Sequence, residues 1–571
     1  MSGGRYQRRK QISRLAGGLT LTLSSLLLII GDTTAQQLPG SVDPGRLQQR
    51  FEPPAPPAPP PPGLPTTPLE EAPSEFRDVR FVLGEVRLQG ATVYDPDDLR
   101  SIWAADLGRE IPLARLYDIA NQISVRYRGD GYILSRAIVP PQDIVGGAVT
   151  IQVIEGYVDR LVLSGDFGGR AAILQAHAEK IVASRPLRAA VLERYLLLMQ
   201  DLPGLALRSV IRPSPDVPGA SDLVLLVGHD FVGAFVQGDN RGTRFNGPEQ
   251  MQTAATLNSP FGWYETLGAQ VAVTPGVDET RFYSLSSSLP LGAEGLSLSL
   301  SAGRLTSRPG STLDVLEVEG RSETYRLGLS YPFIRSRRQN LRLRAGLDML
   351  NSRTDVLQEQ ISKDRIRSLR IALDYDGIDR FFGVNRASAE LSRGLDILGA
   401  RSANAEATSR QGGRNDYTKV TADVSRVQFL QRGWSLQAAG RGQYAFDRLL
   451  SSEEFGFGGE SFGRGYDSSE ILGSHGLAGS LELRYEPAPP DFAQNLQLYA
   501  FYDIGAVWQR NEFPKQVKES AASAGVGLRA TIAETLTGYI ELTRPLTRVP
   551  TTDRDDRERG FRLFVSVSAF F

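Results

Sequence analysis

The chain ends in the stretch FRLFVSVSAFF, residues 561–571, in which the character of the side chains alternates. Every odd-numbered position is apolar, whereas Arg562, Ser566 and Ser568 lie between them. Because successive side chains of a β-strand point to opposite faces, this stretch predicts a strand with one apolar and one more polar face. Something must pair both edges of that strand and cover its apolar face.

The same alternation recurs throughout the chain after His229. Helical periodicity disappears there, and segments of about ten residues are divided by Gly, Pro, Asn, Asp and charged residues. In NLRLRAGLDML, residues 340–350, leucines and Met349 share one face and Arg342, Arg344 and Asp348 share the other. Strands of about 9 to 11 residues with one apolar and one polar face are typical of outer-membrane β-barrels.

We count about sixteen such segments, and we expect them to form a transmembrane antiparallel barrel over 230–571. A barrel in a bilayer must close, because unpaired backbone groups are costly in hydrocarbon. The last strand should therefore pair with the first, FVGAFVQGD at 231–239, with its odd positions toward lipid. A large soluble β-sandwich is the alternative. The segments begin near Phe231, Gln250, Tyr264, Arg281, Gly295, Glu323, Asn340, Arg365, Val384, Asp416, Arg432, Gly476, Asn495, Ala524, Leu536 and Phe561.

Composition narrows the class of protein further. The chain has 571 residues, with Lys+Arg 64 against Asp+Glu 65, so its formal charge of −1 gives no electrostatic basis for binding nucleic acid. Its mean hydropathy of −0.22 argues against a protein of many membrane helices. Cysteine is absent from the sequence, which excludes disulfides, thiolate chemistry and Cys-based metal sites.

The N-terminus has the pattern of a secretory signal peptide over residues 1–35. A basic segment precedes an apolar run from Leu15 to Ile30, and small residues ending at Ala35 follow it. The mature chain would begin near Gln36; an uncleaved membrane anchor is the alternative. An exported chain without cysteine fits a bacterial envelope protein.

A short helix and a spacer are predicted next. Over 36–52 the stretch DPGRLQQRFE offers Asp43 as a helix cap, Pro44 as a first helical residue and Pro53 as a stop. The Pro-rich segment over 53–76 predicts a polyproline II linker, whose proline tract would reach roughly 50 Å at about 3.1 Å per residue.

Two consecutive segments, 77–156 and 157–229, share the predicted order β-α-α-β-β. In the first, the helices are expected over 95–105 and 112–129. A repeated order over about 75 residues indicates a tandem pair of small α+β domains.

The long loop over 445–475 contains EEFGFGGESFGRGYDSSE, with a G-x-S-x-G match at 459–463. A nucleophile elbow needs a strand, a sharp turn and a helix, whereas strands flank this loop, so we expect no hydrolase. Its glycines are not followed by the G-K-[ST] of a phosphate-binding loop. The histidines at positions 177, 229 and 475 are scattered, and we expect no catalytic residue, metal site or cofactor.

Gly463-Arg464-Gly465-Tyr466 resembles the Arg-Gly-aromatic motif in the sixth extracellular loop of two-partner secretion transporters (the TpsB family), which belong to the POTRA-barrel outer-membrane superfamily. FYDIG, with Phe501, Asp503 and Gly505, resembles the family's F-x-D-x-G strand motif. The resemblance implies that the loop folds into the pore and that Arg464 meets Asp503 on the inner wall. Alternation agrees, since Asp503 shares a face with two polar neighbours, Gln497 and Tyr499.

The resemblance extends over essentially the whole mature chain. YRGDGYILSRAIVPPQ at 127–142 resembles the family's first POTRA domain, and the helix within 36–52 resembles its pore plug. Phe571 resembles the C-terminal signal by which outer-membrane proteins reach the barrel assembly machinery. One departure is Gly463, where the family usually has a β-branched residue.

The resemblance implies an outer-membrane transporter, with POTRA domains in the periplasm, that passes an unfolded exoprotein to the cell surface. The POTRA repeats would capture that partner. Folding of the partner outside the cell would drive transport and prevent its return. The other expected partners are outer-membrane lipid and the barrel assembly machinery, with no nucleic acid. An insertase of the same superfamily and a passive diffusion channel are the alternatives.

Overall fold

The computed structural model describes residues 39–51, 79–217, 219–275, 279–402, 405–490, 493–509, 518–533, 535–553 and 559–571. The predicted signal peptide and the Pro-rich linker over 53–76 lie outside the described residues. Among the described helices, none has the length and apolar character needed to cross a membrane.

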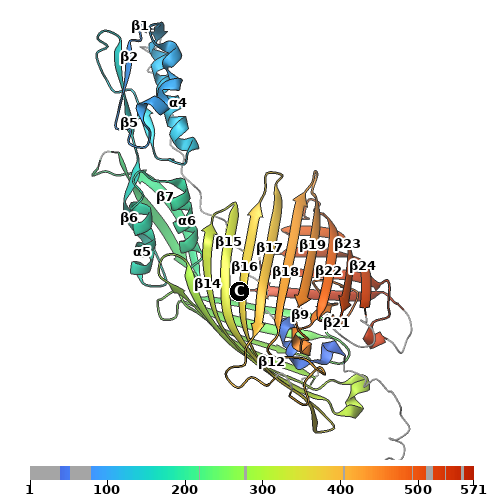
Figure 1. Cartoon of the computed structure of the whole chain (residues 1–571). Coiled ribbons are helices and arrows are strands. Elements are labelled where there is room, and N and C mark those ends of the chain that lie inside the picture. Colours follow the sequence, from blue (N-terminus) through green and yellow to red (C-terminus); the bar gives the residue numbers. More distant parts are fainter. Residues whose placement is uncertain are drawn as a thin grey trace, which may run out of the picture. The chain divides into compact units, whose positions relative to one another are not determined.

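Between residues 232 and 570 the chain forms a closed antiparallel β-barrel (Figure 1), and its strands number sixteen, as predicted. Each strand is hydrogen-bonded to its neighbours in chain order, and a hairpin of two further short strands lies between the eleventh and twelfth. The barrel strands are β9 (Val232–Asp239), β10 (Gln250–Asn258), β11 (Thr266–Val273), β12 (Thr280–Leu291), β13 (Leu296–Ser307), β14 (Glu319–Arg335), β15 (Gln339–Val356), β16 (Glu359–Ile378), β17 (Gly383–Gly394), β18 (Thr418–Phe429), β19 (Trp434–Ala445), β22 (His475–Tyr485), β23 (Asn495–Trp508), β24 (Lys518–Ile532), β25 (Leu536–Pro545) and β26 (Arg562–Phe570).

The last strand closes the barrel against the first. The register of β26 and β9 runs from Ser566 opposite Asp239 to Phe570 opposite Phe235. Leu563 is 55% exposed on the outer surface, whereas Ser566 is buried on the inner one. The sequence prediction that the odd-numbered positions of the last strand face outward is therefore confirmed.

Several strands are longer than the ten or so residues that the sequence pattern predicted, and three of them are much longer. β14, β15 and β16 contain 17, 18 and 20 residues. Their additional residues remain paired, as Glu319 opposite Asp355 and Thr354 opposite Ser362 show. Apart from a register shift between Thr354 and Asp355, ladder hydrogen bonds therefore extend this part of the wall at the end away from the start of β9.

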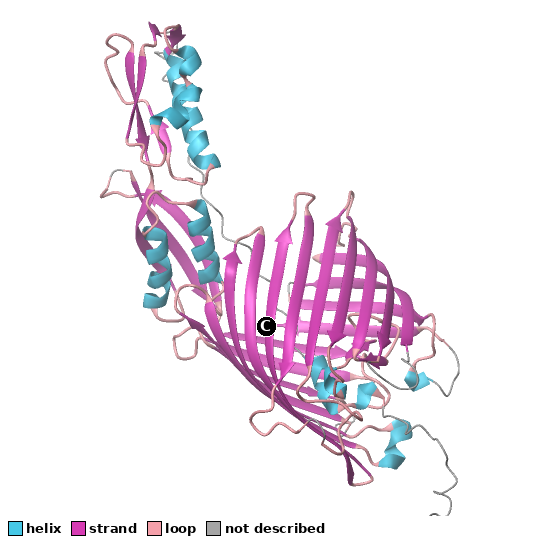
Figure 2. Cartoon of the chain, viewed as in Figure 1, coloured by secondary structure: helices cyan, strands magenta, loops and turns pink. Residues whose placement is uncertain are grey.

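The segment before the barrel contains two small α+β domains. In the first, α4 (Leu113–Gly129) packs on one face of a sheet of order β2-β5-β4 (Figure 2). The helix predicted over 95–105 is instead one α-turn followed by two 3-10 turns, which bring Leu99 and Trp103 into the core. The other elements are β1 (Arg80–Val82), β2 (Glu85–Gln89), α3 (Pro96–Leu99), η4 (Arg100–Ile102), η5 (Ala104–Asp106), β3 (Glu110–Pro112), β4 (Arg136–Ile138) and β5 (Ala148–Ile154).

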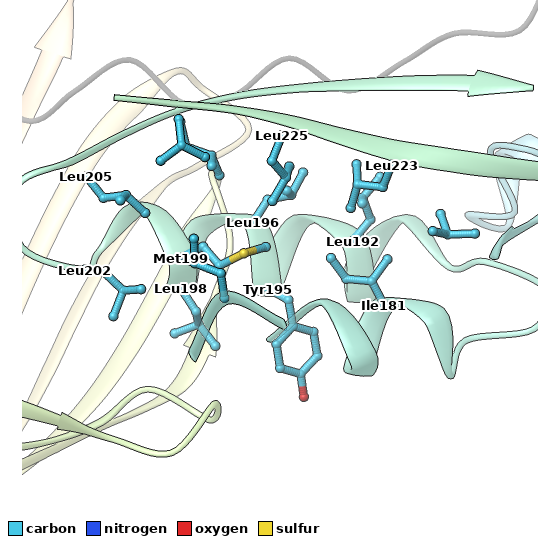
Figure 3. Packing of buried hydrophobic residues seen from close by; sticks show 14 of the residues in the cluster. Ile181, Leu192, Tyr195, Leu196, Leu198, Met199, Leu202, Leu205, Leu223 and Leu225 are labelled. Atoms are coloured by element: carbon cyan, nitrogen blue, oxygen red, sulfur yellow. The ribbon is translucent and has the colours of Figure 1, made fainter. Parts of the chain in front are cut away.

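The second domain has the same pairing scheme. Its sheet order is β6-β8-β7, with the first and last strands in the chain parallel, just as β2 and β5 are in the first domain. Leu192 and Leu196 from α6 pack toward Leu223 and Leu225 from β8 (Figure 3). The elements are β6 (Tyr157–Gly165), α5 (Ala171–Val182), α6 (Ala189–Gln200), β7 (Leu205–Pro213) and β8 (Ala220–His229).

Candidate functional site

The loop between β19 and β22 packs against the inner wall of the barrel. It contains η7 (Ser451–Glu453) and a hairpin of β20 (Phe455–Phe457) and β21 (Ile471–Gly473). Phe457 is completely buried, in a cluster with Val507 and Ala521 on inward faces of the wall. Apolar contact thus holds residues 446–474, hereafter the inner loop, inside the barrel.

At the tip of the inner loop, Arg464 forms an ion pair with Asp503 on β23. The Arg464 Nε and Nη2 atoms each donate a hydrogen bond to an Asp503 carboxylate oxygen at 3.0 Å, and the Arg464 backbone N–H donates to Oδ2 at 3.0 Å. Arg464 is 5% exposed and Asp503 is fully buried. Removing one partner of this bidentate, enclosed ion pair is much more destabilising than removing one partner of a surface salt bridge, because it leaves a buried charge.

Two further groups complete the environment of Arg464. Its Nη1 atom donates to Glu482 on β22, and its guanidinium carbon lies 3.4 Å from the centre of the Phe501 ring. Burial alone would lower the pKa of Arg464, but the hydrogen bonds and charges of Asp503 and Glu482 outweigh burial and raise that pKa. The arginine is therefore a permanent cation.

Gly465 and Tyr466 continue the contact with the wall. The Gly465 N–H donates to Ser523 Oγ at 3.2 Å, and a Cβ at this position would lie 2.9 Å from Ser523 Cβ. Tyr466 is buried, and its hydroxyl donates to the Ala522 carbonyl at 2.9 Å. The close approach of Gly465 and the hydroxyl of Tyr466 fix the loop on β24.

Two other glycines permit this docking. A Cβ on Gly505 would lie 2.2 Å from the Phe457 ring, so only glycine leaves room for that ring on β23. Gly463 has a φ of +79°, and its N–H donates to Asp503 Oδ2 at 3.1 Å. A β-branched residue would be strained at this φ, so glycine permits the backbone conformation in which this N–H reaches the aspartate.

Sequence reasoning missed Glu482, which connects the Arg464 pair to other wall residues. Its carboxylate accepts from Arg529 on β24 and from Arg484 on its own strand, each at 2.7 Å. Alternation in GLAGSLELRYE places Ser480, Glu482 and Arg484 on one polar face, and this pattern could have indicated Glu482 as an inner-wall residue. The sequence did not show that this face meets the loop tip.

The N-terminal segment 40–51, hereafter the plug segment, lies against the inner wall. It comprises η1 (Gly40–Val42), α2 (Pro44–Gln48) and η2 (Gln49–Phe51), so the predicted helix is one short α-helix between 3-10 turns. Asp43 caps it by accepting from Gly45 N and Arg46 N. The buried cluster that it joins consists of Leu47, Phe51, Ala272, Phe282 and Leu305.

Arg46 of the plug segment connects both arms of the inner loop. Its Nη1 atom donates to the carbonyls of Ser451 and Glu454 at 2.7 and 2.8 Å. On the returning arm, Ser469 Oγ accepts from Nε at 3.1 Å and from Nη2 at 3.0 Å. Arg46 is buried, so these hydrogen bonds replace those it would make to water.

A second buried ionic cluster holds the entering arm of the loop. The Glu453 carboxylate lies 2.8 Å from Arg370 on β16 and 2.8 Å from Lys419 on β18. Burial would raise the pKa of Glu453, but these two cations outweigh it and lower that pKa to about 2.

A cavity of about 1040 Å³ lies inside the barrel. Residues of the plug segment, the inner loop and the barrel wall line it.

The remaining predicted residues lie elsewhere. Phe571 extends the pairing of the last strand, since its N–H donates to the Ala234 carbonyl at 2.8 Å while its side chain is 76% exposed. No helix follows the G-x-S-x-G match in the described loop, and the three histidines lie on α5, β8 and β22.

The chain has two small α+β domains followed by a closed barrel, and an Arg-Gly-Tyr loop lies on the inner wall of that barrel. This combination defines an outer-membrane transporter of the POTRA-barrel class. Residues 219–530 match the family model described as haemolysin secretion/activation protein ShlB/FhaC/HecB, and residues 81–156 match the POTRA domain of ShlB type. The chain belongs to this haemolysin secretion/activation family.

Individual relatives agree with the family model. Heme/hemopexin transporter protein HuxB of Haemophilus influenzae is 22% identical over 571 residues, which cover 94% of this chain and 96% of the relative. Outer membrane transporter CdiB of Dickeya dadantii is 24% identical over 454 residues, covering 78% of each chain.

Solved structures share the fold. CdiB from Escherichia coli gives a TM-score of 0.68 at 20% identity, covering 89% of this chain and 94% of that one. BamA from Haemophilus ducreyi lacking POTRA domains 1–3 gives a TM-score of 0.53 at 14% identity, covering 86% and 100%.

Membership of this family makes the chain a two-partner secretion transporter of the outer membrane, as predicted. Its relatives are transporters rather than enzymes. Since POTRA domains are periplasmic in the family, the end of the barrel at which β9 begins is periplasmic, and the inner loop starts from the extracellular end. The alternative of a soluble sandwich is wrong.

Proposed function

We propose that this transporter conducts one unfolded exoprotein through its barrel and closes the path at rest with two elements, the plug segment and the inner loop. The observation that carries the proposal is Arg46, which reaches from the plug segment to the Ser451 and Glu454 carbonyls and to Ser469. Both elements lie inside the wall, so a polypeptide must displace them.

Displacement of one element weakens the hold on the other. If the plug segment leaves, the two loop carbonyls lose their charged donor, and each buried group left unpaired costs about 1–3 kcal/mol unless water replaces that donor. The loop then retains its anchor at Arg464 and Asp503. Opening is accordingly stepwise, with the plug segment first and the loop tip last.

The two POTRA domains would supply the first contact with the exoprotein. The edges of their main sheets are β2 and β4 in the first domain and β6 and β7 in the second. Val210 on β7 is exposed, which supports capture of an extended segment by strand addition with an apolar side-chain contact. Folding of the exoprotein outside would then prevent its return.

Assembly of the transporter itself would use the C-terminal strand. Phe571 projects its ring outward at the seam with the first strand, where the barrel assembly machinery could contact it. The apolar outer surface would contact the outer-membrane lipid.

Coexpression in a secretion-deficient host tests the proposed function. The full transporter should release its cognate exoprotein to the medium, whereas a host without the transporter should retain it in the periplasm. The insertase alternative predicts instead that unrelated outer-membrane barrels assemble faster when the transporter is present. That second result, without release of the exoprotein, would refute the proposal.

A further inference from the structure

The outer surface of the barrel carries a row of basic residues across five neighbouring strands. Arg281, Thr306, Arg321, Arg353 and Lys363 are successive register partners on β12, β13, β14, β15 and β16. Directly opposite residues of antiparallel strands lie on the same face. Four of the five side chains are cationic, and we refer to the five residues as the basic row.

The basic row lies above the apolar belt at the extracellular end. On β14, Tyr325, Leu327 and Leu329 share the outward face with Arg321 and are between 43% and 46% exposed. Arg321 precedes them near the extracellular start of that strand. On β14 the row therefore stands at the extracellular edge of the apolar belt, where the acyl region of the outer leaflet gives way to its head groups.

Like charges directly opposite one another destabilise a sheet, and the basic row contains two such pairs in succession. Arg321 is opposite Arg353, and Arg353 is opposite Lys363. The protein compensates in part, because Glu319 lies 3.1 Å from Arg321 and Asp355 lies 2.8 Å from Arg353.

A second row immediately below adds cations to the same sector. Arg304 opposes Glu323 and lies 3.7 Å from it, and Arg365 opposes Asn351. Arg393 on β17 is also exposed on the outward face. The sector beyond it differs, because the outward positions near the extracellular ends of β18 and β19 hold Val420 and Tyr444. The cations are thus concentrated over β12 to β17.

We propose that the basic row binds the phosphate groups of lipopolysaccharide, the phosphorylated glycolipid of the outer leaflet. Guanidinium groups match phosphate oxygens in pairs, and the repulsion between neighbouring cations is relieved when an anion lies between them. The leucines below the row accept the acyl chains. The ligand therefore combines acyl chains with a phosphorylated head group. A free phosphate ion would contact the cations but not the leucines below them.

Binding can be measured by native mass spectrometry of the purified full-length chain in zwitterionic detergent. The probes are lipid A, dephosphorylated lipid A and inorganic phosphate. The variant is Arg321→Gln/Arg353→Gln/Lys363→Gln. Arg544→Gln is the matched control, because Arg544 is also exposed near the extracellular end, on β25.

Lipid A should bind the wild type and Arg544→Gln equally, and bind the triple variant at least tenfold more weakly. Dephosphorylated lipid A and inorganic phosphate should each bind the wild type at least tenfold more weakly than lipid A. Without lipid A, the triple variant should still be heat-modifiable like the wild type, which shows that weak lipid binding is not due to loss of the folded barrel. Equal lipid A binding by the wild type and the triple variant, or equal binding of intact and dephosphorylated lipid A, would overturn the assignment.

Discussion

Arg464 and Asp503 are 39 residues apart in the chain, yet two side-chain hydrogen bonds of 3.0 Å join them on the inner wall of the barrel. A third hydrogen bond to the same carboxylate comes from the backbone N–H of Arg464. One aspartate thus fixes both the side chain and the main chain of the loop tip. This contact anchors the tip independently of the plug segment, which acts nearer the base of the loop.

The anchor predicts the effect of removing the arginine. Arg464→Ala leaves the carboxylates of Asp503 and Glu482 buried beside each other, and breaking a buried pair in this way costs about 3–5 kcal/mol. We expect secretion of the exoprotein to be lost while the barrel still assembles. Immunoblots of culture medium and a heat-modifiability assay on outer membranes measure the two outcomes.

A matched control for that variant is Arg344→Ala. Arg344 on β15 also pairs with an aspartate, Asp374, and lines the cavity, but its side chain is 49% exposed. Median surface pairs contribute only about 0–1 kcal/mol, so secretion should be unchanged. If Arg464→Ala secretes as well as the control, the loop anchor has no role in transport.

The plug segment predicts a change in conductance. Deleting residues 36–52 removes Arg46, Leu47 and Phe51 from the inner wall and should enlarge the open path beside the cavity of about 1040 Å³. Single-channel conductance in planar bilayers should rise, and secretion should survive. A conductance identical to that of the full chain would mean that the segment does not obstruct the pore.

An engineered disulfide tests whether the plug segment must leave the loop. A Cβ on Gly45 would lie 3.1 Å from Ser452 Cβ, close to the spacing of about 3.5–4.5 Å that disulfides need. Since the chain has no cysteine, Gly45→Cys/Ser452→Cys creates one defined bond. Secretion should stop when the bond is oxidised and resume with reductant.

Each single cysteine variant is the control for that lock, and both should secrete under either condition. Free passage of the exoprotein through the oxidised double variant, with the disulfide verified by mass spectrometry, would show that the plug segment and loop need not separate.

Glu470 on the inner loop predicts a pH dependence of stability. Burial raises the pKa of this carboxyl from 4.5 to about 7, with Asp467 adding to the effect and Thr551 and Arg548 opposing it. Its Oε2 atom is buried without a hydrogen-bond partner among the described residues. The folded protein therefore holds a proton that the unfolded chain releases near pH 4.5, and this contribution to stability is lost as the pH rises from about 4.5 to 7.

Glu470→Gln removes the titrating proton and keeps the shape of the side chain. The variant should be at least as stable as the wild type at pH 8, and its stability should vary less between pH 4.5 and 7. Thermal melts of the detergent-purified protein at several pH values measure this, with Glu486→Gln in a periplasmic turn as a control. A wild-type slope retained in Glu470→Gln would assign the titration to another group.

Arginine substitutions at adjacent residues of the last strand should differ in severity, because the two side chains face opposite sides of the wall. Val567 is 48% exposed outward, near the middle of the strand, and Ser568 faces inward. An arginine on the lipid face at mid-membrane costs about 2–4 kcal/mol, whereas one in the lumen can remain hydrated. Val567→Arg should reduce the amount of heat-modifiable barrel in the outer membrane, and Ser568→Arg should be milder.

Equal yields of the two variants would contradict the assignment of faces. Ser566 also faces inward, but it is only 5% exposed, so an arginine there would meet crowding as well as lumen. Ser568 is therefore the cleaner partner for this comparison.

Period-two alternation allowed the barrel to be predicted from the sequence. Segments such as 340–350 and 561–571 present apolar side chains on one face, and that pattern is a local property that needs no knowledge of neighbours. The number of strands came from counting these segments, and closure followed because a bilayer does not tolerate unpaired strand edges. Resemblance to a known family, rather than alternation, indicated Arg464 and Asp503 as partners.

Only the tertiary structure decided which polar side chains meet inside the wall. Arg46 contacts the Glu454 carbonyl 408 residues further along the chain, and Glu482 receives Arg464 from a loop whose path no local pattern specifies. The register of β14, β15 and β16 likewise places Arg321, Arg353 and Lys363 side by side. These contacts depend on strand register and loop trajectory, which follow from packing of the whole barrel, whereas alternation depends only on the geometry of a single strand.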